Sequence, residues 1–288
     1  AWLVLAYGVS SAGAAVLFRG GQREVLLAFA LGLLCGLLSA LTAKSTRLSR
    51  VFEPTAAFLA AFLAVVAAHR FAPVSDRVVT LAGLIALLPG LSLTVAMNEL
   101  ATRHLVSGTT RLMGAVTVFL TLAFGVAFGR RFAELLCGSV PPELAGSPLP
   151  DWAVWPALAA LTFAFVVNLA ARPRDALGIL LTGLLGFQSA RSGSLLLGAE
   201  LGAFAGALVV GASSNLLARL ERRPAAVTLV PGLLLLVPGS IGYQSLSFFI
   251  AHDVLSGMES AFRTTLTAIA LVGGLLFANV LLPPRRTL

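Results

Sequence analysis

Charged residues are scarce in this sequence, and their scarcity excludes most classes of soluble protein. Only 11% of the 288 residues are Asp, Glu, Lys or Arg, whereas 58% are hydrophobic. A soluble globular domain carries about 25% charged residues. A water-soluble enzyme and a disordered chain are therefore excluded. The net charge of +8 does not indicate a nucleic-acid partner, because the 20 Lys and Arg are scattered between apolar runs instead of forming a patch.

Cysteine and histidine are also scarce, and the common catalytic and metal-binding motifs are missing. Cys35 and Cys137 lie in or beside apolar runs and are expected to be packed small residues, not a disulfide. The 3 histidines are far apart, and the sequence lacks HxxxH, CxxC, GxSxG and GxxxxGK[ST] patterns. We therefore expect no catalytic residue, no metal and no cofactor, and ATP-driven transport would need a separate subunit.

Long apolar runs separated by short polar breaks dominate what is present. They are longer than strands and lack strand alternation. A membrane-spanning helix needs roughly 20 apolar residues, so a chain of this length accommodates about ten. The predicted fold class is an all-α polytopic membrane protein with helices over 2–18, 25–43, 54–70, 78–98, 108–129, 152–171, 175–190, 194–218, 225–246 and 257–282. The start at Ala1 has no Met and no signal peptide, so an upstream segment is expected.

An internal repeat divides these helices. A shift of 149 residues gives ten identities over the 49 positions 81–129, against roughly four or five by chance. A polar interruption over 130–150 predicts a linker. The predicted organisation is a repeat over 1–139, a linker over 140–150 and a repeat over 151–288. Five helices in each repeat would invert the second relative to the first, as in many secondary transporters, although channels also contain such repeats.

Two Pro-Gly pairs lie inside apolar runs at corresponding positions of the repeat. Proline removes a backbone donor and glycine loosens the next turn, so helix breaks are expected at Pro89-Gly90 and Pro238-Gly239. Breaks at membrane depth are usually buried or line a cavity, because freed backbone groups need partners. Amides at the start of the second half-helix can bind a substrate carboxylate. A simple kink is the alternative reading of either pair.

Polar side chains follow both pairs at helical spacing. Thr94 and Asn98 follow the first pair. Four residues that share one helix face follow the second pair: Ser240, Tyr243, Gln244 and Ser247. Hydroxyls and amides bind the polar groups of a small zwitterion without burying a charge. Hydrogen bonding between helices is the alternative function of these residues.

Ionisable residues near the apolar runs are few, and three acids are candidate proton carriers. Glu99 ends the fourth run and is the first choice, Asp253 lies in the matching stretch of the second repeat, and Glu200 lies near the start of the eighth run. The alternatives are solvated interfacial charges for Glu99 and Asp253 and an acidic helix start for Glu200.

The stretches around the first Pro-Gly pair resemble a known family. They are residues 86–94, 98–101 and 105–112, with 236–240 and 274–285 in the second half. Their order and spacing resemble the threonine/serine exporters over essentially the whole chain. The resemblance implies efflux of threonine and serine that depends on the proton-motive force, in a prokaryotic plasma membrane, and a cytoplasmic N-terminal segment. The chain departs from the family pattern where Arg103-His104 stands in place of a second acid.

The combined prediction is a multi-pass inner-membrane antiporter that exports small hydroxy amino acids by alternating access. Its partners would be the amino acid, protons and the lipid bilayer, with no nucleic acid, and a homo-oligomer is left open. The alternatives are a succinate-like dicarboxylate exporter, or a membrane enzyme or scaffold. An enzyme would need His and acids at one depth, and a scaffold would not need the polar stripes. Twelve Lys and Arg on the side of the N-terminus against eight on the other predict cytoplasmic termini.

Overall fold

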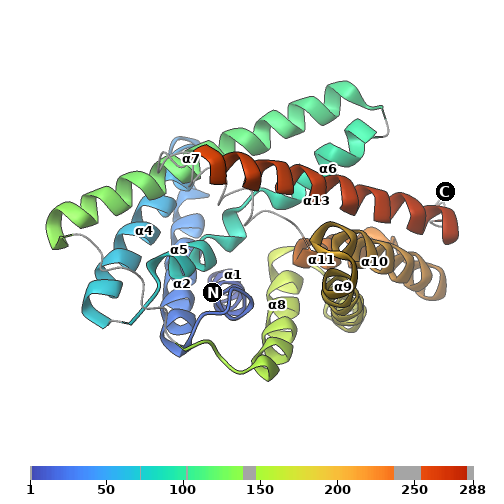
Figure 1. Cartoon of the computed structure of the whole chain (residues 1–288), viewed down its shortest axis with the longest axis horizontal. Helices are drawn as coiled ribbons and strands as arrows, with labels where there is room; N and C mark the ends of the chain where they lie inside the picture. The colour runs from blue at the N-terminus through green and yellow to red at the C-terminus, as the bar shows by residue number, and fades with distance from the viewer. Residues whose placement is uncertain (1, 72, 102, 139–146, 237–253, 284–288) are drawn as a thin grey trace. The chain divides into compact units, whose positions relative to one another are not determined.

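The described part of the chain is helical (Figure 1). The computed structural model describes residues 2–283 except 72, 102, 139–146 and 237–253, and no strand occurs in these ranges. The all-α prediction is confirmed. The helices are α1 (Trp2–Leu17), α2 (Gln22–Thr42), α3 (Thr46–Ser49), α4 (Phe52–Phe71), α5 (Asp76–Gly83), η1 (Ile85–Leu87), α6 (Gly90–Ala101), α7 (Leu105–Cys137), η2 (Asp151–Ala153), α8 (Val154–Asn168), η3 (Pro173–Asp175), α9 (Ala176–Leu197), α10 (Ala199–Glu221), α11 (Ala226–Leu236) and α13 (Val254–Leu281).

Six of the described helical segments are long and apolar enough to cross a membrane. They are α2, α4, α7, η2 with α8, α10 and most of α13. The stretch from α5 to α6 is a seventh only if its two bent pieces count as one span, and α1 and α11 are apolar but shorter. A multi-pass membrane protein is therefore supported, whereas ten spanning helices and the inverted relation of the halves remain predictions.

Helix α7 continues beyond its predicted end and takes in the start of the predicted linker. Arg130 Nε donates to Glu134 Oε1 at 3.0 Å, and Arg131 lies 3.7 Å from the other oxygen of the same carboxylate. Ion pairs one helical turn apart stabilise a helix whose residues are polar. The first part of the polar interruption, from Arg130 to Cys137, is therefore helical and is not a linker, whereas the linker over 140–150 stays a prediction.

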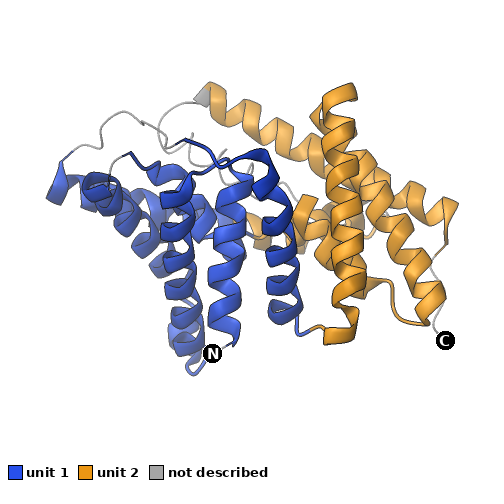
Figure 2. Cartoon of the chain, turned by 90° about the horizontal axis from the view of Figure 1, so that it is seen from below, with its two compact units in different colours: residues 1–88, 118–170 blue, residues 89–117, 171–288 orange. Residues whose placement is uncertain are grey.

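The chain forms two compact units (Figure 2), and unit 1 consists of residues 1–88 and 118–170. Within it, α1 packs against α2 and α8, and α5 packs against α1, α2 and α4. Glycine permits the closest approaches. A Cβ added to Gly32 would lie 2.8 Å from the Cα of Gly8, and one added to Gly125 would lie 2.8 Å from the Cβ of Ala57. Small residues thus bring the backbones of neighbouring helices together.

Unit 2 consists of residues 89–117 and 171–288. Helix α10 packs against α9, α11 and α13, while α6 packs against α13 and α11. A Cβ added to Gly274 would lie 2.9 Å from the Cβ of Ala207, so α13 also lies close to α10. The segment 89–117 therefore makes its contacts with later helices, and residues 151–170 make theirs with earlier ones. Residues 89–117 of the first half of the sequence thus belong to unit 2, and residues 151–170 of the second half belong to unit 1.

Candidate functional site

The helical path is interrupted at Pro89, immediately before α6. Leu88 is extended, with φ −66° and ψ 126°, and α6 begins at Gly90. The Leu93 amide donates to the Pro89 carbonyl at 3.0 Å. The helix break predicted at Pro89-Gly90 is therefore observed. The amides of residues 90–92 belong to the first turn, whose N–H groups are the ones that a helix start presents to an anion.

Thr94 and Asn98 lie one turn apart on the same face of α6, as their spacing predicts. Thr94 is buried, and its hydroxyl donates to the Gly90 carbonyl at 3.2 Å. This bond occupies the only donor of the side chain and leaves its oxygen able to accept. Asn98 is half-buried. The stripe therefore continues directly from the helix start toward Glu99.

A tight turn with left-handed backbone joins α6 to α7. Arg103 has φ +65°, and its amide donates to the Leu100 carbonyl at 3.1 Å. The amide of His104 donates to the Glu99 carbonyl at 2.8 Å. These two bonds form a Schellman motif, in which glycine usually takes the left-handed position. Arg103 takes it here at a strain of about 1 kcal/mol, because its Cβ crowds the following carbonyl.

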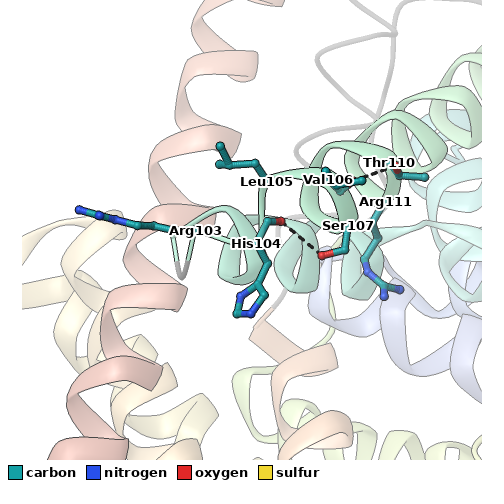
Figure 3. Close-up of a pocket in the computed structure, with 7 residues that line it drawn as sticks. All are labelled: Arg103, His104, Leu105, Val106, Ser107, Thr110 and Arg111. Atoms are coloured by element: carbon teal, nitrogen blue, oxygen red, sulfur yellow. Dashed lines mark hydrogen bonds between the residues drawn. The ribbon is translucent and has the colours of Figure 1, made fainter.

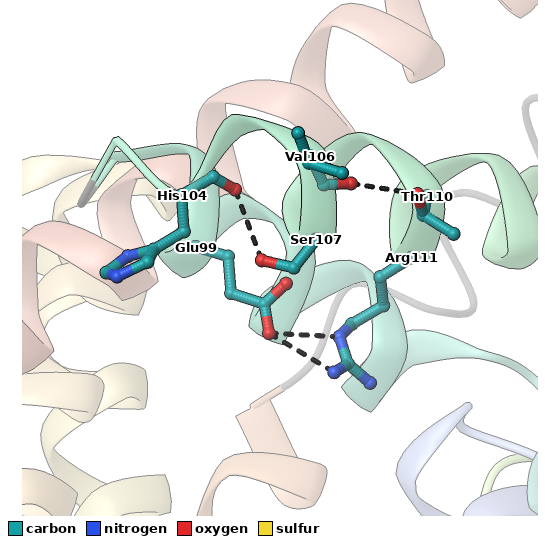
Figure 4. Close-up of polar contacts among 6 residues, drawn as sticks. All are labelled: Glu99, His104, Val106, Ser107, Thr110 and Arg111. Atoms are coloured by element: carbon teal, nitrogen blue, oxygen red, sulfur yellow. Dashed lines mark hydrogen bonds and ion pairs between the residues drawn. The ribbon is translucent and has the colours of Figure 1, made fainter.

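The turn brings the carboxylate of Glu99 against Arg111 (Figure 4). Arg111 donates from Nε at 3.3 Å and from Nη2 at 3.2 Å to the same oxygen, Glu99 Oε1. The two side chains are 21% and 47% exposed, so the ion pair is partly shielded from solvent. Gly108 permits the close return of α7, because an added Cβ would lie 2.8 Å from Leu100 Cγ. Sequence reasoning selected Glu99 but missed its partner, although a tight turn after Glu99 would have indicated one.

An open basin of about 760 Å³ lies beside this ion pair, at the start of α7 (Figure 3). The Ser107 hydroxyl donates to the His104 carbonyl at 3.3 Å, and the Thr110 hydroxyl donates to the Val106 carbonyl at 2.8 Å. Both hydroxyls retain an accepting oxygen. Guanidinium groups bind carboxylates, so the basin suits an anionic group. Its lining residues are Arg103, His104, Leu105, Val106, Ser107, Thr110 and Arg111.

The remaining predicted site residues fall into two groups. Glu200 lies half-buried in the first turn of α10, where a carboxylate is favoured by the helix N-terminus. The others lie outside the described residues, which end at Leu236 and resume at Val254: Pro238, Gly239, Ser240, Tyr243, Gln244, Ser247 and Asp253. The structure therefore places the first polar stripe and leaves the second as a prediction.

Two further ion pairs involve buried acids that sequence reasoning did not single out. Asp76 Oδ2 lies 3.0 Å from Arg130 Nη1 in unit 1, and Asp175 pairs with Arg223 in unit 2. Both aspartates are buried. Within the described ranges, no three His, Cys, Asp or Glu side chains come together as a metal site would require. No sequence signal links residues so distant along the chain.

Fungal membrane proteins are among the relatives of the chain. It is 27% identical over 275 residues to pheromone-regulated membrane protein 10 of Debaryomyces hansenii, which covers 92% of the chain and 27% of that protein. It is 28% identical over 284 residues to the protein of the same name in Eremothecium gossypii, which covers 91% of the chain and 35% of that protein. The chain thus spans about a quarter to a third of the length of the curated relatives it matches. No solved structure matches.

These relatives correct the predicted location. An uncharacterised protein of Schizosaccharomyces pombe is 25% identical over 280 residues, again from a eukaryote. The prediction of a prokaryotic plasma membrane is therefore wrong. It came from the family resemblance, whereas apolar runs report only that a membrane is crossed and not which membrane. The multi-pass membrane character is retained.

Family comparison accounts for both halves of the chain. Two family models, each described as a threonine/serine exporter, match residues 1–133 and residues 153–281. Together they take in the broken stretch at Pro89, the Glu99–Arg111 pair and the helices of the second half. The predicted resemblance is confirmed, and the chain belongs to the threonine/serine exporter family of membrane proteins.

Proposed function

We propose that the chain is a secondary carrier that exports threonine and serine in exchange for protons. The observation that carries this proposal is the construction of α6. Its start is interrupted by Pro89, and its end holds the partly shielded ion pair of Glu99 and Arg111. Family membership supports a small-molecule substrate moved across a membrane. That the substrate is a hydroxy amino acid, that protons drive its transport and that the direction is export are parts of our proposal.

Substrate would bind near the start of α6. The amides of residues 90–92 would receive its carboxylate, and Thr94 and Asn98 would bind its hydroxyl or ammonium group. The matching stripe of the second repeat would complete the site, with Pro238 and Gly239 freeing a second helix start and Ser240, Tyr243, Gln244 and Ser247 adding polar contacts. In such a site, the dipoles of backbone amides and polar side chains stabilise both charges of a zwitterion, so the protein needs no buried charged side chain of its own.

Glu99 would couple transport to protons without touching the substrate carboxylate. At about 1.5 Å per residue, the end of α6 lies roughly 15 Å from its start, which exceeds the length of threonine. Protonation of Glu99 would remove the charge that holds Arg111 and release the turn between α6 and α7. We propose that this release changes the side of the membrane from which the substrate site is open. Asp253 and Glu200 are the further acids of this proposal.

A dicarboxylate substrate is the second candidate, and the basin beside Arg111 favours it. Arg103 and Arg111 both line this basin, and His104 adds a titratable ring. Arg103 supplies a guanidinium beyond the Glu99–Arg111 pair, and a second carboxylate on the substrate would match it. Inhibition by succinate distinguishes the two candidates, because a hydroxy amino acid site selects against a second carboxylate.

Efflux from proteoliposomes tests the proposal. Vesicles containing the protein are loaded with radiolabelled threonine, serine or succinate, and efflux is followed with and without an imposed proton gradient. We expect the gradient to accelerate threonine and serine efflux about tenfold. No protein-dependent efflux of either amino acid would reject the proposal, and efflux of succinate alone would establish the second candidate.

Replacing Glu99 tests the coupling step separately. Glu99→Gln keeps the size of the side chain but removes its titratable charge. We expect threonine exchange to persist and the acceleration by a proton gradient to disappear. Glu221→Gln is a matched control, since Glu221 also lies 3.1 Å from an arginine, Arg223, at a more exposed position. Full acceleration in Glu99→Gln would exclude Glu99 as the coupling residue.

A further inference from the structure

Five arginines lie at the end of unit 2 where α10 ends and α9 begins, and we call them the arginine patch. They come from η3 with the residue before it, and from the last turn of α10 with the residues after it: Arg172, Arg174, Arg219, Arg222 and Arg223. Helix α10 is a candidate span, so this end is expected at the membrane surface. The stretches 172–175 and 219–223 contain two acids, Asp175 and Glu221, so five arginines leave an excess of three positive charges.

One arginine holds the two stretches together. Arg223 pairs with the buried Asp175 and also lies 3.1 Å from Glu221. Helix α9 packs along α10, and the Cβ of a side chain at Gly178 would lie 3.6 Å from Leu217 Cδ1. Both acids of the patch are therefore engaged by the same guanidinium, which fixes the residues before α9 beside those after α10. A ligand of the patch would find its binding groups already in place.

The remaining arginines can receive a ligand. Arg172, Arg174 and Arg222 are exposed, and their side chains form no ion pair or hydrogen bond with any residue that the structure describes. Arg219 donates from Nη2 to the Pro283 carbonyl at 2.7 Å and keeps its other N–H groups. Guanidinium groups bind phosphate oxygens through paired hydrogen bonds. The patch therefore suits a phosphate group.

The backbone at Arg222 adds a second indication. Arg222 has φ 53° and ψ 43°, and the next amide, of Arg223, donates to the Ala218 carbonyl at 3.3 Å. Glycine usually takes this left-handed position, because a Cβ crowds the following carbonyl. The last turn of α10 already has a basic residue that complements the helix dipole, Arg219. An arginine at a position where glycine would be less strained indicates a function for its side chain.

Exposed leucines beside the patch favour a lipid over a free phosphate ion. Leu216 and Leu220 lie one turn apart on α10 and are 46% and 71% exposed. Leu177, two residues after Asp175, is 66% exposed. A phosphate ion has no apolar part for these side chains to contact, whereas the acyl chains of a phospholipid do. Guanidinium groups at the helix ends and leucines along the span match the two parts of a phospholipid.

We propose that the arginine patch binds the headgroup of an anionic phospholipid. Arg172, Arg174 and Arg222 contact the phosphate, Arg223 positions the two stretches, and the acyl chains lie along the exposed leucines. The patch belongs to the side of the chain that is predicted to be cytoplasmic, and the cytoplasmic leaflet carries anionic lipids. Each arginine near such a surface strengthens binding about fivefold. The inference goes beyond the proposed transport function and does not depend on the substrate.

Thermal unfolding of the purified protein in neutral detergent tests the patch without any transport. Phosphatidylglycerol is titrated in mixed micelles, and the rise in unfolding temperature gives its apparent affinity. We expect a rise with phosphatidylglycerol and none with phosphatidylcholine, whose choline cancels the phosphate charge. The triple variant Arg172→Gln, Arg174→Gln and Arg222→Gln should weaken the apparent affinity for phosphatidylglycerol about a hundredfold.

A matched control removes three exposed arginines that are scattered over α3, α7 and α13: Arg50→Gln, Arg131→Gln and Arg263→Gln. This variant loses the same charge, and its affinity should fall by less than about fivefold. Equal losses in the two triple variants would overturn the patch as a site, because the lipid would then respond to overall charge. An equal rise in unfolding temperature with inorganic phosphate alone would overturn the lipid as the occupant.

Arg222→Gly separates binding from folding. Without lipid, this variant should unfold at a higher temperature, because glycine adopts the left-handed backbone without strain. Its apparent affinity for phosphatidylglycerol should nevertheless fall about fivefold. A purely structural arginine would not produce these opposite changes. Unchanged affinity in Arg222→Gly would overturn the role of Arg222 in the headgroup site, and this variant serves if the triple variant does not fold.

Discussion

The described parts of the two halves hold a similar succession of helices but connect them with different chemistry. Helices α7 and α13 begin at Leu105 and Val254, which are 149 residues apart. Helix α7 packs on α4, and helix α13 packs on α10. Ring contacts recur as well, between Phe58 and Phe128 at 5.4 Å and between Phe204 and Phe277 at 5.6 Å. The steric features of the repeat are thus shared.

The positions of the ion pairs separate the halves, since Asp175 and Arg223 of the second half fall on Leu26 and Val74 of the first. Where the first half has Asp76, Arg130 and Glu134, the second has Ala225, Asn279 and Pro283. Glu99 and Arg111 also lack charged counterparts, since the offset places Phe248 and Ser260 there. The comparison teaches that apolar packing fixes the architecture of both halves. Ionisable groups that the packing does not need are therefore the best candidates for function.

The largest expected effect concerns the shared glycines. An added Cβ would lie 2.8 Å from the Ala57 Cβ at Gly125 and 2.9 Å from the Ala207 Cβ at Gly274. Gly125→Val and Gly274→Val should each destabilise the protein by about 3 kcal/mol, because the neighbouring backbone cannot move aside. Thermal unfolding in detergent measures both.

Gly114→Ala is the control for this pair, because an added Cβ there meets nothing within 4 Å. It should leave the unfolding temperature unchanged or slightly raised. Strong destabilisation by only one of the two valine variants would show that the halves do not share this packing.

An intermediate effect is expected where the second half uses amides. Asn215→Ala removes both the bond to Asn279 and the bond to the Leu282 carbonyl. We expect a loss of about 1.5 kcal/mol in unfolding free energy, because acceptors are left without their donor. Ser213→Ala on the same helix is the control, since its hydroxyl bonds only carbonyls of its own helix. Equal unfolding temperatures for the two variants would contradict a structural role for the amide pair.

The smallest expected effect concerns the turn that forms the Glu99–Arg111 pair. Arg103→Gly should stabilise the protein by about 1 kcal/mol, because glycine adopts the left-handed φ without strain. The same variant removes one guanidinium from the basin, so succinate inhibition should weaken if that basin binds dianions. A lower unfolding temperature of Arg103→Gly would show that the contacts of the Arg103 side chain stabilise the protein by more than the strain of its left-handed backbone destabilises it.

Many of the helix positions could be predicted from the sequence, because the signals that mark them are local. The predictions that were wrong depended on contacts that such signals do not report. Apolar runs report local burial, so α2, α4 and α10 appear close to their predicted ranges. The break at Pro89 is local too, because proline removes a donor wherever it stands. By contrast, composition alone placed Arg130 in a linker, although its bond to Glu134 continues the helix.

The ion pairs could not be predicted, because periodicity does not say which distant helix a side chain meets. Glu99 was selected as an isolated acid, but its contact with Arg111 depends on the left-handed turn at Arg103. Asp76 was not selected, since a single acid at a helix start usually favours only the helix N-terminus. Its burial and its contact with Arg130 come from the packing of α5 and α7 in unit 1.

Threonine-driven proton movement tests the central claim most directly. Proteoliposomes containing the protein and an internal pH-sensitive dye are loaded with threonine and diluted into threonine-free buffer at equal pH. The account predicts acidification of the interior as threonine leaves, because each export step brings protons inward, and no acidification for the Glu99→Gln variant. Threonine efflux from the unaltered protein without any change of internal pH would contradict it.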